Sequence, residues 1–130
     1  MLLYLVRHAE AAPGSPDELR PLTARGREAA RAVGQRLRAE NTRVDAVVSS
    51  PLLRARETAA AIAREVGVEP EVADALAPGA SRADVLAAID GRGEVVVAVG
   101  HQPDCGRIAA ALDGGDEPPF PPGGCHRMAL

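Results

Sequence analysis

The chain has 130 residues, of which 46% are hydrophobic, and we expect one globular domain covering residues 1–130. The formal net charge of −3 and the aromatic content of 2% argue against a nucleic-acid-binding protein, which needs a basic surface and, for single strands, stacking side chains. All 15 basic residues are arginines, and we attribute this bias to a GC-rich, alanine-heavy coding background rather than to phosphate binding.

The first predicted element is a buried strand. Residues 2–6 read Leu-Leu-Tyr-Leu-Val, a continuous apolar run that is typical of a strand covered on both faces in a parallel α/β sheet. Arg7 and His8 follow this run directly. Because ligands bind beyond the carboxyl ends of parallel strands, these two side chains are predicted to lie at a functional site. Taken alone, they fit a strand end that merely faces water equally well.

A helix predicted from Thr23 to about Glu40 comes next, with Thr23 as its N-cap and with Gly26, Ala30, Val33 and Leu37 on its buried face. A second apolar strand, residues 44–48, then leads into a helix predicted over about 52–66.

The start of this second helix holds a candidate site residue. We expect Ser50 to be the N-cap and Pro51 to occupy the first helical position. Arg54 then lies one turn into the helix, beside the free amides of the helix N-terminus. Because those amides and the helix dipole attract anions, Arg54 is predicted to bind one.

A third buried strand is predicted over residues 94–99, after a short helix over about 81–89, and it ends in Gly100 and His101. Three strand ends therefore deliver two arginines and two histidines to one crevice. Guanidinium groups bind the oxygens of a tetrahedral dianion with charge-assisted hydrogen bonds. Since no carboxylate cluster with metal-ligand spacing accompanies them, we expect neither a metal nor a cofactor.

The alternation of strands and helices is typical of a doubly wound, three-layer α/β/α fold with a mostly parallel central sheet. A last helix is predicted over about 104–112. Two stretches rich in proline and glycine, residues 12–18 and 113–124, are predicted to be loops that border the site.

Three motifs in this order resemble the histidine phosphatase superfamily, which includes phosphoglycerate mutases and acid phosphatases: Arg-His-Ala-Glu at 7–10, Ser-Pro-Leu-Leu-Arg-Ala at 50–55, and Gly-His at 100–101. The short length and two further segments, Arg-Pro-Leu-Thr at 20–23 and Leu-Ala-Pro-Gly at 76–79, are most similar to its SixA-type phosphohistidine phosphatases. The resemblance runs from residue 2 to about residue 112.

The resemblance implies a phosphoglycerate mutase-like fold and a role for each site residue. His8 is the expected nucleophile, and Arg7, Arg54 and His101, together with neighbouring Gln102, are the expected phosphate ligands. The implied reaction is metal-independent phosphate hydrolysis through a phosphohistidine on the enzyme, in which two easier displacements replace one difficult displacement. Residues 125–130 are implied to form an edge strand.

The chain departs from the larger family members in its acidic residues. Those members use, as general acid, an Asp or Glu on the segment that follows the third strand of their own sheet. The corresponding segment in this chain is residues 72–79, and it has no acidic residue beyond Leu76. Glu10 and Asp74 are the candidate acids, with Glu71 lying close to Asp74. We expect each of them to be a solvated loop carboxylate, as in the SixA-type branch, because a protonated imidazole leaves without further help.

The expected substrate is a phosphorylated protein, with a small phosphate ester as the alternative, because the loops are too short to form a lid domain. A non-catalytic phosphate-binding module is a further alternative, but a histidine at position 8 favours an enzyme. The apolar start is too short for a signal peptide, and no segment approaches membrane-spanning length. With Cys105 and Cys125 expected to be reduced thiols, we expect a cytoplasmic protein without a membrane partner.

Overall fold

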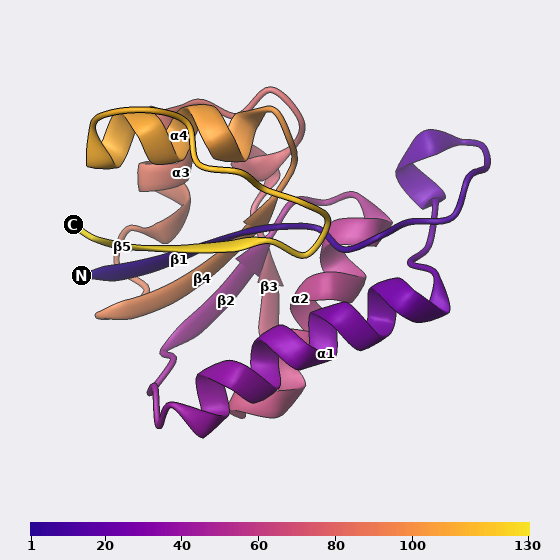
Figure 1. The fold of residues 1–130 in the computed structure, drawn as a ribbon, viewed down its shortest axis with the longest axis horizontal. Coiled ribbons are helices and arrows are strands. Elements are labelled where there is room, and N and C mark those ends of the chain that lie inside the picture. Colours follow the sequence, from indigo (N-terminus) through magenta and orange to yellow (C-terminus); the bar gives the residue numbers. More distant parts are fainter.

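A computed structural model describes all residues, 1–130, and contains one five-stranded sheet with the order β3-β2-β4-β1-β5 (Figure 1). The strands are β1 (Leu2–Arg7), β2 (Ala46–Ser49), β3 (Pro70–Val72), β4 (Val95–Gly100) and β5 (Cys125–Ala129). β1 to β4 pair in parallel, and only β5 runs antiparallel, against β1. This is the mostly parallel α/β sheet that the sequence predicts.

The helices cover both faces of the sheet (Figure 1). They are α1 (Ala24–Ala39), α2 (Leu53–Val66), α3 (Arg82–Ile89) and α4 (Asp104–Asp113), with short 3-10 helices at Asp17–Leu19 and Asp74–Leu76. α1 and α2 lie on one face and α3 and α4 on the other, which confirms the three-layer architecture. None of these helices has the length and apolar character that crossing a lipid bilayer requires.

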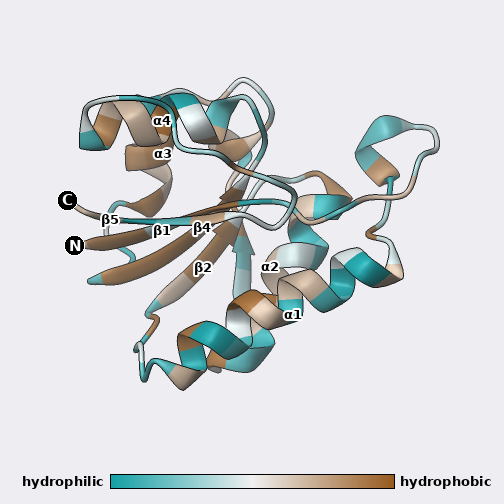
Figure 2. Ribbon diagram, viewed as in Figure 1, coloured by the Kyte–Doolittle hydropathy of each residue, from teal (hydrophilic) through white to brown (hydrophobic).

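The core is divided by the sheet into two apolar layers, and the central strands β1, β2 and β4 are its most hydrophobic part (Figure 2). Successive side chains of a strand point to opposite faces. In β1, Leu3 and Leu5 accordingly pack with α3 and α4, whereas Tyr4 and Val6 pack with α1 and α2. The apolar run of residues 2–6 is thus buried on both sides, as predicted.

Of the two helix caps that the sequence predicts, Thr23 is confirmed and Ser50 is not. The Thr23 hydroxyl caps α1 by accepting the Gly26 N–H, and Ser81 caps α3 in a reciprocal capping box. The prediction that Ser50 caps α2 is wrong, because α2 begins at Leu53 with Leu52 as its N-cap. Ser50 Oγ instead accepts the Leu52 N–H, at 3.2 Å, and so closes a turn that precedes the helix.

The sequence analysis predicts one edge strand of the sheet and misses the other. β5 forms within the expected range 125–130 and is an edge strand. At the opposite edge, β3 contains Pro70, Glu71 and Val72, all three exposed, and apolar runs do not reveal it. A strand that buries neither face has no hydrophobic pattern by which it could be found.

Substituting Gly26 should test how tightly α1 is packed. A Cβ at Gly26 would lie 2.1 Å from the Glu10 carbonyl oxygen. Gly26→Ala should therefore lower the free energy of unfolding by roughly 1–3 kcal/mol, despite alanine's helix-propensity advantage of about 1 kcal/mol. Urea unfolding measures the change. In the matched control Gly106→Ala, also at the third position of a helix, Cβ meets side-chain atoms and no backbone: the movable carboxylate of Glu117 at 3.0 Å and the Gln102 amide at 3.5 Å. Equal effects of the two substitutions would contradict this packing.

Candidate active site

Strand register brings the two predicted histidines together. β1 pairs with β4 so that Arg7 lies opposite Gly100, and the next residue, His8, donates its backbone N–H to the Gly100 carbonyl at 3.0 Å. His101 follows Gly100 directly. The ring centroids of His8 and His101 are 5.2 Å apart, and the ring planes are tilted by 57°. Residues distant in the sequence therefore meet at the carboxyl ends of two adjacent strands.

His8 is held in an orientation that leaves one ring nitrogen free to react. Its Nδ1 lies 2.8 Å from the Ala9 carbonyl oxygen. Because a carbonyl can only accept a hydrogen bond, Nδ1 carries the proton, and in the neutral ring Nε2 has the free lone pair. Burial lowers the pKa of His8, and the charges of Arg54, Arg7 and Arg20 lower it further, although the bond to Ala9 acts in the opposite direction. The imidazole is therefore kept neutral and nucleophilic at neutral pH.

The backbone beside His8 is fixed to α2 by a buried threonine. The Ala9 N–H donates to Thr58 Oγ1 at 3.0 Å, and the Thr58 hydroxyl donates to the Arg54 carbonyl oxygen at 2.8 Å. Thr58 is fully buried. The backbone next to His8 and that of Arg54 therefore belong to one hydrogen-bonded unit, although they lie on different elements.

Arg7 has a donor with no partner inside the protein. Its Nη1 donates to the Phe120 carbonyl oxygen at 3.0 Å, which ties the loop before β5 to the site. Its Nε is buried and makes no hydrogen bond. A buried unpaired donor costs free energy until an acceptor reaches it. The side chain thus retains hydrogen-bonding capacity for an anion.

Arg54 is almost completely buried, with 7% of its surface exposed, and is oriented by Asp17. Its Nη1 donates to the Asp17 carbonyl oxygen at 2.9 Å, and its Nη2 donates to Asp17 Oδ2 at 3.2 Å. Arg20 donates to Asp17 Oδ1 at 2.9 Å and, through Nε, to the Ala12 carbonyl oxygen at 2.8 Å. The hydrogen bond from Arg20 is the main cause of the lowered pKa of Asp17, and Arg54 also contributes.

Sequence reasoning did not predict roles near the site for Thr58, or for Asp17 and Arg20 of the loop after β1, although Arg20 begins the Arg-Pro-Leu-Thr segment. The loop of residues 12–18 was expected to border the site, but the roles of Asp17 and Arg20 depend on long-range contacts. The only sequence signal is their i, i+3 spacing in a loop, which predicts an ion pair between them but gives no link to Arg54.

His101 is 4% exposed, and its Nε2 lies 2.7 Å from Ser50 Oγ. Burial lowers the pKa of His101 to about 4, with smaller contributions from the neighbouring His8 and Arg54. His101 is therefore neutral at pH 7 in the free protein. Ser50, predicted to be a helix cap, instead lies between the start of α2 and the imidazole, and it links the second and third motifs of the sequence.

The remaining predicted site residues are placed differently. Gln102 Oε1 accepts the Gly106 N–H at 2.8 Å, so this side chain stabilises the first turn of α4. Glu10 accepts the Thr23 hydroxyl at 2.8 Å, and exposed Asp74 begins a 3-10 helix. Glu71 forms an ion pair with Arg92. None of these three carboxylates is hydrogen-bonded to His8, His101, Arg7 or Arg54.

The site can attract an anion without carrying a metal-binding cluster. No three His, Cys, Asp or Glu side chains are grouped so that they could hold a metal ion. Both cysteines are free, and burial raises the pKa of Cys105 to about 12, which makes it a poor nucleophile. A crevice with a neutral imidazole beside arginine side chains is therefore suited to binding and attacking a phosphate group.

Comparisons with known proteins agree with this geometry. Residues 3–78 match the model of the histidine phosphatase superfamily (branch 1), and the chain belongs to this family. It is a phosphatase, and hence a hydrolase, of this superfamily.

Three proteins are similar to this chain along most of its length. An uncharacterized protein of Picosynechococcus sp. is 40% identical over 86% of this chain and 73% of the relative. The phosphohistidine phosphatase SixA of Escherichia coli is 29% identical over 92% of this chain and 79% of that protein. A solved structure of the protein histidine phosphatase SixA complexed with tungstate superposes with a TM-score of 0.90 at 27% identity, covering 100% of this chain and 88% of that one. Two of these three relatives are SixA proteins.

The lowered pKa values of His8 and His101 predict pH-dependent anion binding. Sulfate remains a dianion above pH 4, and when bound it would offset the arginine charges and raise both pKa values. Sulfate binding should therefore be accompanied by proton uptake at His8 and His101 between about pH 4 and pH 6.5. Because one pKa unit corresponds to about a tenfold change in affinity, sulfate should bind about tenfold more tightly at pH 5 than at pH 7.5. Calorimetry in two buffers measures both affinity and proton uptake.

His101→Gln removes one of the two titrating groups and should reduce the pH dependence. His126→Ala, which alters a histidine paired with Asp113 outside the site, should leave it unchanged. The same dissociation constant at both pH values in the unsubstituted protein would show that sulfate does not bind beside these imidazoles.

Proposed function

We propose that this protein is a metal-independent protein phosphohistidine phosphatase in which His8 is the nucleophile. The observation that carries the proposal is the hydrogen bond from His8 Nδ1 to the Ala9 carbonyl, since it leaves Nε2 unprotonated beside Arg7 and Arg54. Arginine side chains stabilise the charge that spreads over the phosphoryl oxygens during transfer.

The reaction takes place in two displacements. In the first, His8 Nε2 forms a bond to phosphorus as the bond to the substrate imidazole nitrogen breaks, and the substrate imidazole leaves in neutral form because it entered protonated. In the second, water attacks phosphorus, the bond to Nε2 breaks, and the products are inorganic phosphate and His8. The water proton is released to solvent or to phosphate, so no redox partner or metal takes part.

The substrate class follows from the absence of a general acid, which an alkoxide leaving group needs. An alkoxide leaves slowly unless a general acid protonates it, whereas a protonated imidazole needs no such help. Glu10 and Asp74 are not bonded to the site, and Asp17 stays ionised because Arg20 lowers its pKa. Asp104 is occupied by the Gly79 N–H at 2.7 Å. No carboxylate is therefore arranged as an acid for a sugar phosphate.

The shape of the surface also favours a macromolecular substrate. A surface groove of about 720 Å³ lies between α1 and α2, and His8 and His101 line neither this groove nor three further hollows of the surface. A small metabolite is usually enclosed by its binding pocket. An open crevice instead gives access to a phosphorylated side chain on another protein.

A trapping experiment tests the nucleophile. With ³²P-labelled phosphoprotein and an alkaline quench, the label should appear on the enzyme, remain stable in alkali and be lost in acid. His8→Ala should abolish both label and turnover while leaving the circular dichroism spectrum unchanged. His126→Ala is the matched control and should retain both, since His126 pairs with Asp113 away from the crevice. Turnover by the His8→Ala variant above a few per cent would rule out this mechanism.

A comparison of leaving groups tests the substrate class. The enzyme should hydrolyse protein phosphohistidine and p-nitrophenyl phosphate efficiently and simple alkyl phosphates poorly. Only the first two substrates have leaving groups that depart without a general acid. Glu10→Gln and Asp74→Asn should each change phosphohistidine turnover less than tenfold, since neither carboxylate contacts the site. Efficient sugar-phosphate hydrolysis that is lost in one of these variants would instead identify a small-metabolite phosphatase and its acid.

A further inference from the structure

The loop of residues 12–20 stands out from the rest of the molecule beside the candidate site (Figure 1). It contains the 3-10 helix Asp17–Leu19, in which no residue is buried. Leu19 is 56% exposed, the highest value among the exposed large hydrophobic side chains of the protein. A single exposed leucine is ordinary, but this one lies two residues from Asp17, which holds Arg54.

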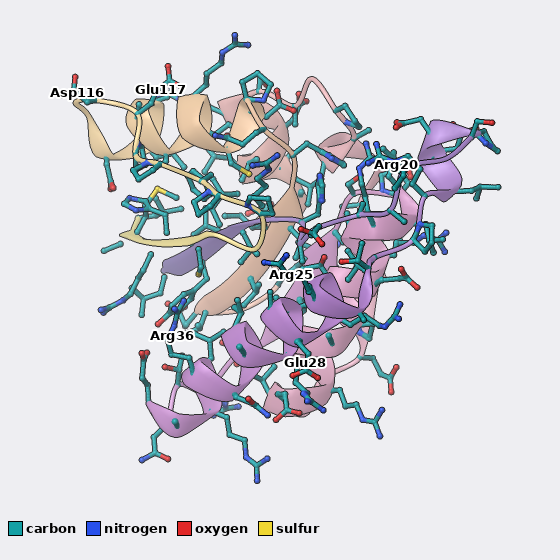
Figure 3. The ribbon with its side chains drawn as sticks, turned by 45° about the vertical axis from the view of Figure 1, so that its right-hand side comes forward. Arg20, Arg25, Glu28, Arg36, Asp116 and Glu117 are labelled. Carbon is teal, nitrogen blue, oxygen red and sulfur yellow. The ribbon has the colours of Figure 1, made fainter.

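This loop is firmly attached although it buries no side chain of its 3-10 helix. Arg54 donates two hydrogen bonds to Asp17, and Arg20 donates one to Asp17 and one to Ala12. Figure 3 shows Arg20 beside the point where the loop meets the rest of the molecule. The hydrogen bonds fix the position of Leu19 relative to the arginine that is expected to bind phosphate. An element preorganised in this way loses little entropy when a partner binds it.

The chemistry of the loop indicates which partner fits it. Besides Leu19, it presents the exposed carboxylate of Glu18, and Glu10 is exposed at the adjoining end of β1. Arg54, which is bonded to Asp17 of this loop, and Arg20 both act on His8 through their charge, so a protein that brings a phosphohistidine to His8 approaches the loop. The complementary surface has an apolar side chain with basic residues next to the phosphorylated histidine, since opposite charges steer association and suppress incorrect partners.

We propose that the loop of residues 12–20 is the docking element for the phosphohistidine-carrying protein, with Leu19 as the apolar contact and Glu18 as the charged one. The proposal rests on the proposed function. Small phosphorylated molecules occupy only the crevice and do not extend to Leu19. The loop therefore contributes to selection of the protein substrate and not to the chemical step.

The test compares a protein substrate with a small one. The probes are a histidine phosphotransfer domain phosphorylated on its histidine and p-nitrophenyl phosphate, and kcat and KM are measured for both. Leu19→Ser should lower kcat/KM for the phosphorylated domain about tenfold, mainly by raising KM, as loss of an apolar anchor at an interface does. It should change kcat/KM for p-nitrophenyl phosphate less than twofold. Glu18→Lys should show the same selectivity, with a smaller effect at high salt.

Leu86→Ser is the matched control, because Leu86 is 37% exposed on α3, outside the site. It should leave both substrates unaffected. If the unsubstituted protein hydrolyses p-nitrophenyl phosphate but not the phosphorylated domain, the proposed function is wrong and the docking proposal is overturned with it. If it hydrolyses both, but Leu19→Ser and Glu18→Lys leave KM for the domain unchanged or alter both substrates equally, only the docking proposal is overturned.

Discussion

Parallel pairing of β1 with β4 is the constraint on which the candidate site depends. The register that sets Arg7 opposite Gly100 places the following residues, His8 and His101, at the same edge of the sheet. A slip of one residue would turn every side chain of β1 to the other face and exchange the two apolar layers. Because both faces of the strand are packed, the hydrophobic core fixes this register and thereby the relative positions of His8 and His101.

A second constraint is electrostatic, because the crevice concentrates positive charge in a protein of net charge −3. Arg54 is buried, and burying a charge is costly unless it is paired and hydrogen-bonded. Asp17 supplies both partners of Arg54 and is itself shared with Arg20. Burial is the main cause of the lowered pKa of His8 and of His101, and the charge of Arg54 lowers both further, so that the charge which attracts an anion also helps to keep the imidazoles neutral.

The loop of residues 12–20 connects this charge network to the surface. On the proposed function, the crevice admits a phosphorylated side chain of another protein and is therefore open. An open crevice places little restriction on what surrounds the phosphorylated group, so selectivity has to come from contacts outside the crevice. An exposed loop hydrogen-bonded to Arg54, the arginine expected to bind phosphate, is in a position to provide such contacts.

The sequence by itself determined the three central strands, the helices and the family, but not the edge strand β3. Continuous apolar runs over residues 2–6 and 94–99 identified strands buried on both faces, and the residues at their ends identified the expected histidines and arginines. Only the tertiary structure decided the partners of those residues: Ser50 contacts His101 rather than capping α2, Gln102 stabilises α4, and Asp17 with Arg20 holds Arg54. The physical reason is that periodicity and local propensity report burial and backbone conformation along the chain, whereas the hydrogen bonds of polar side chains depend on residues that folding brings close from distant segments.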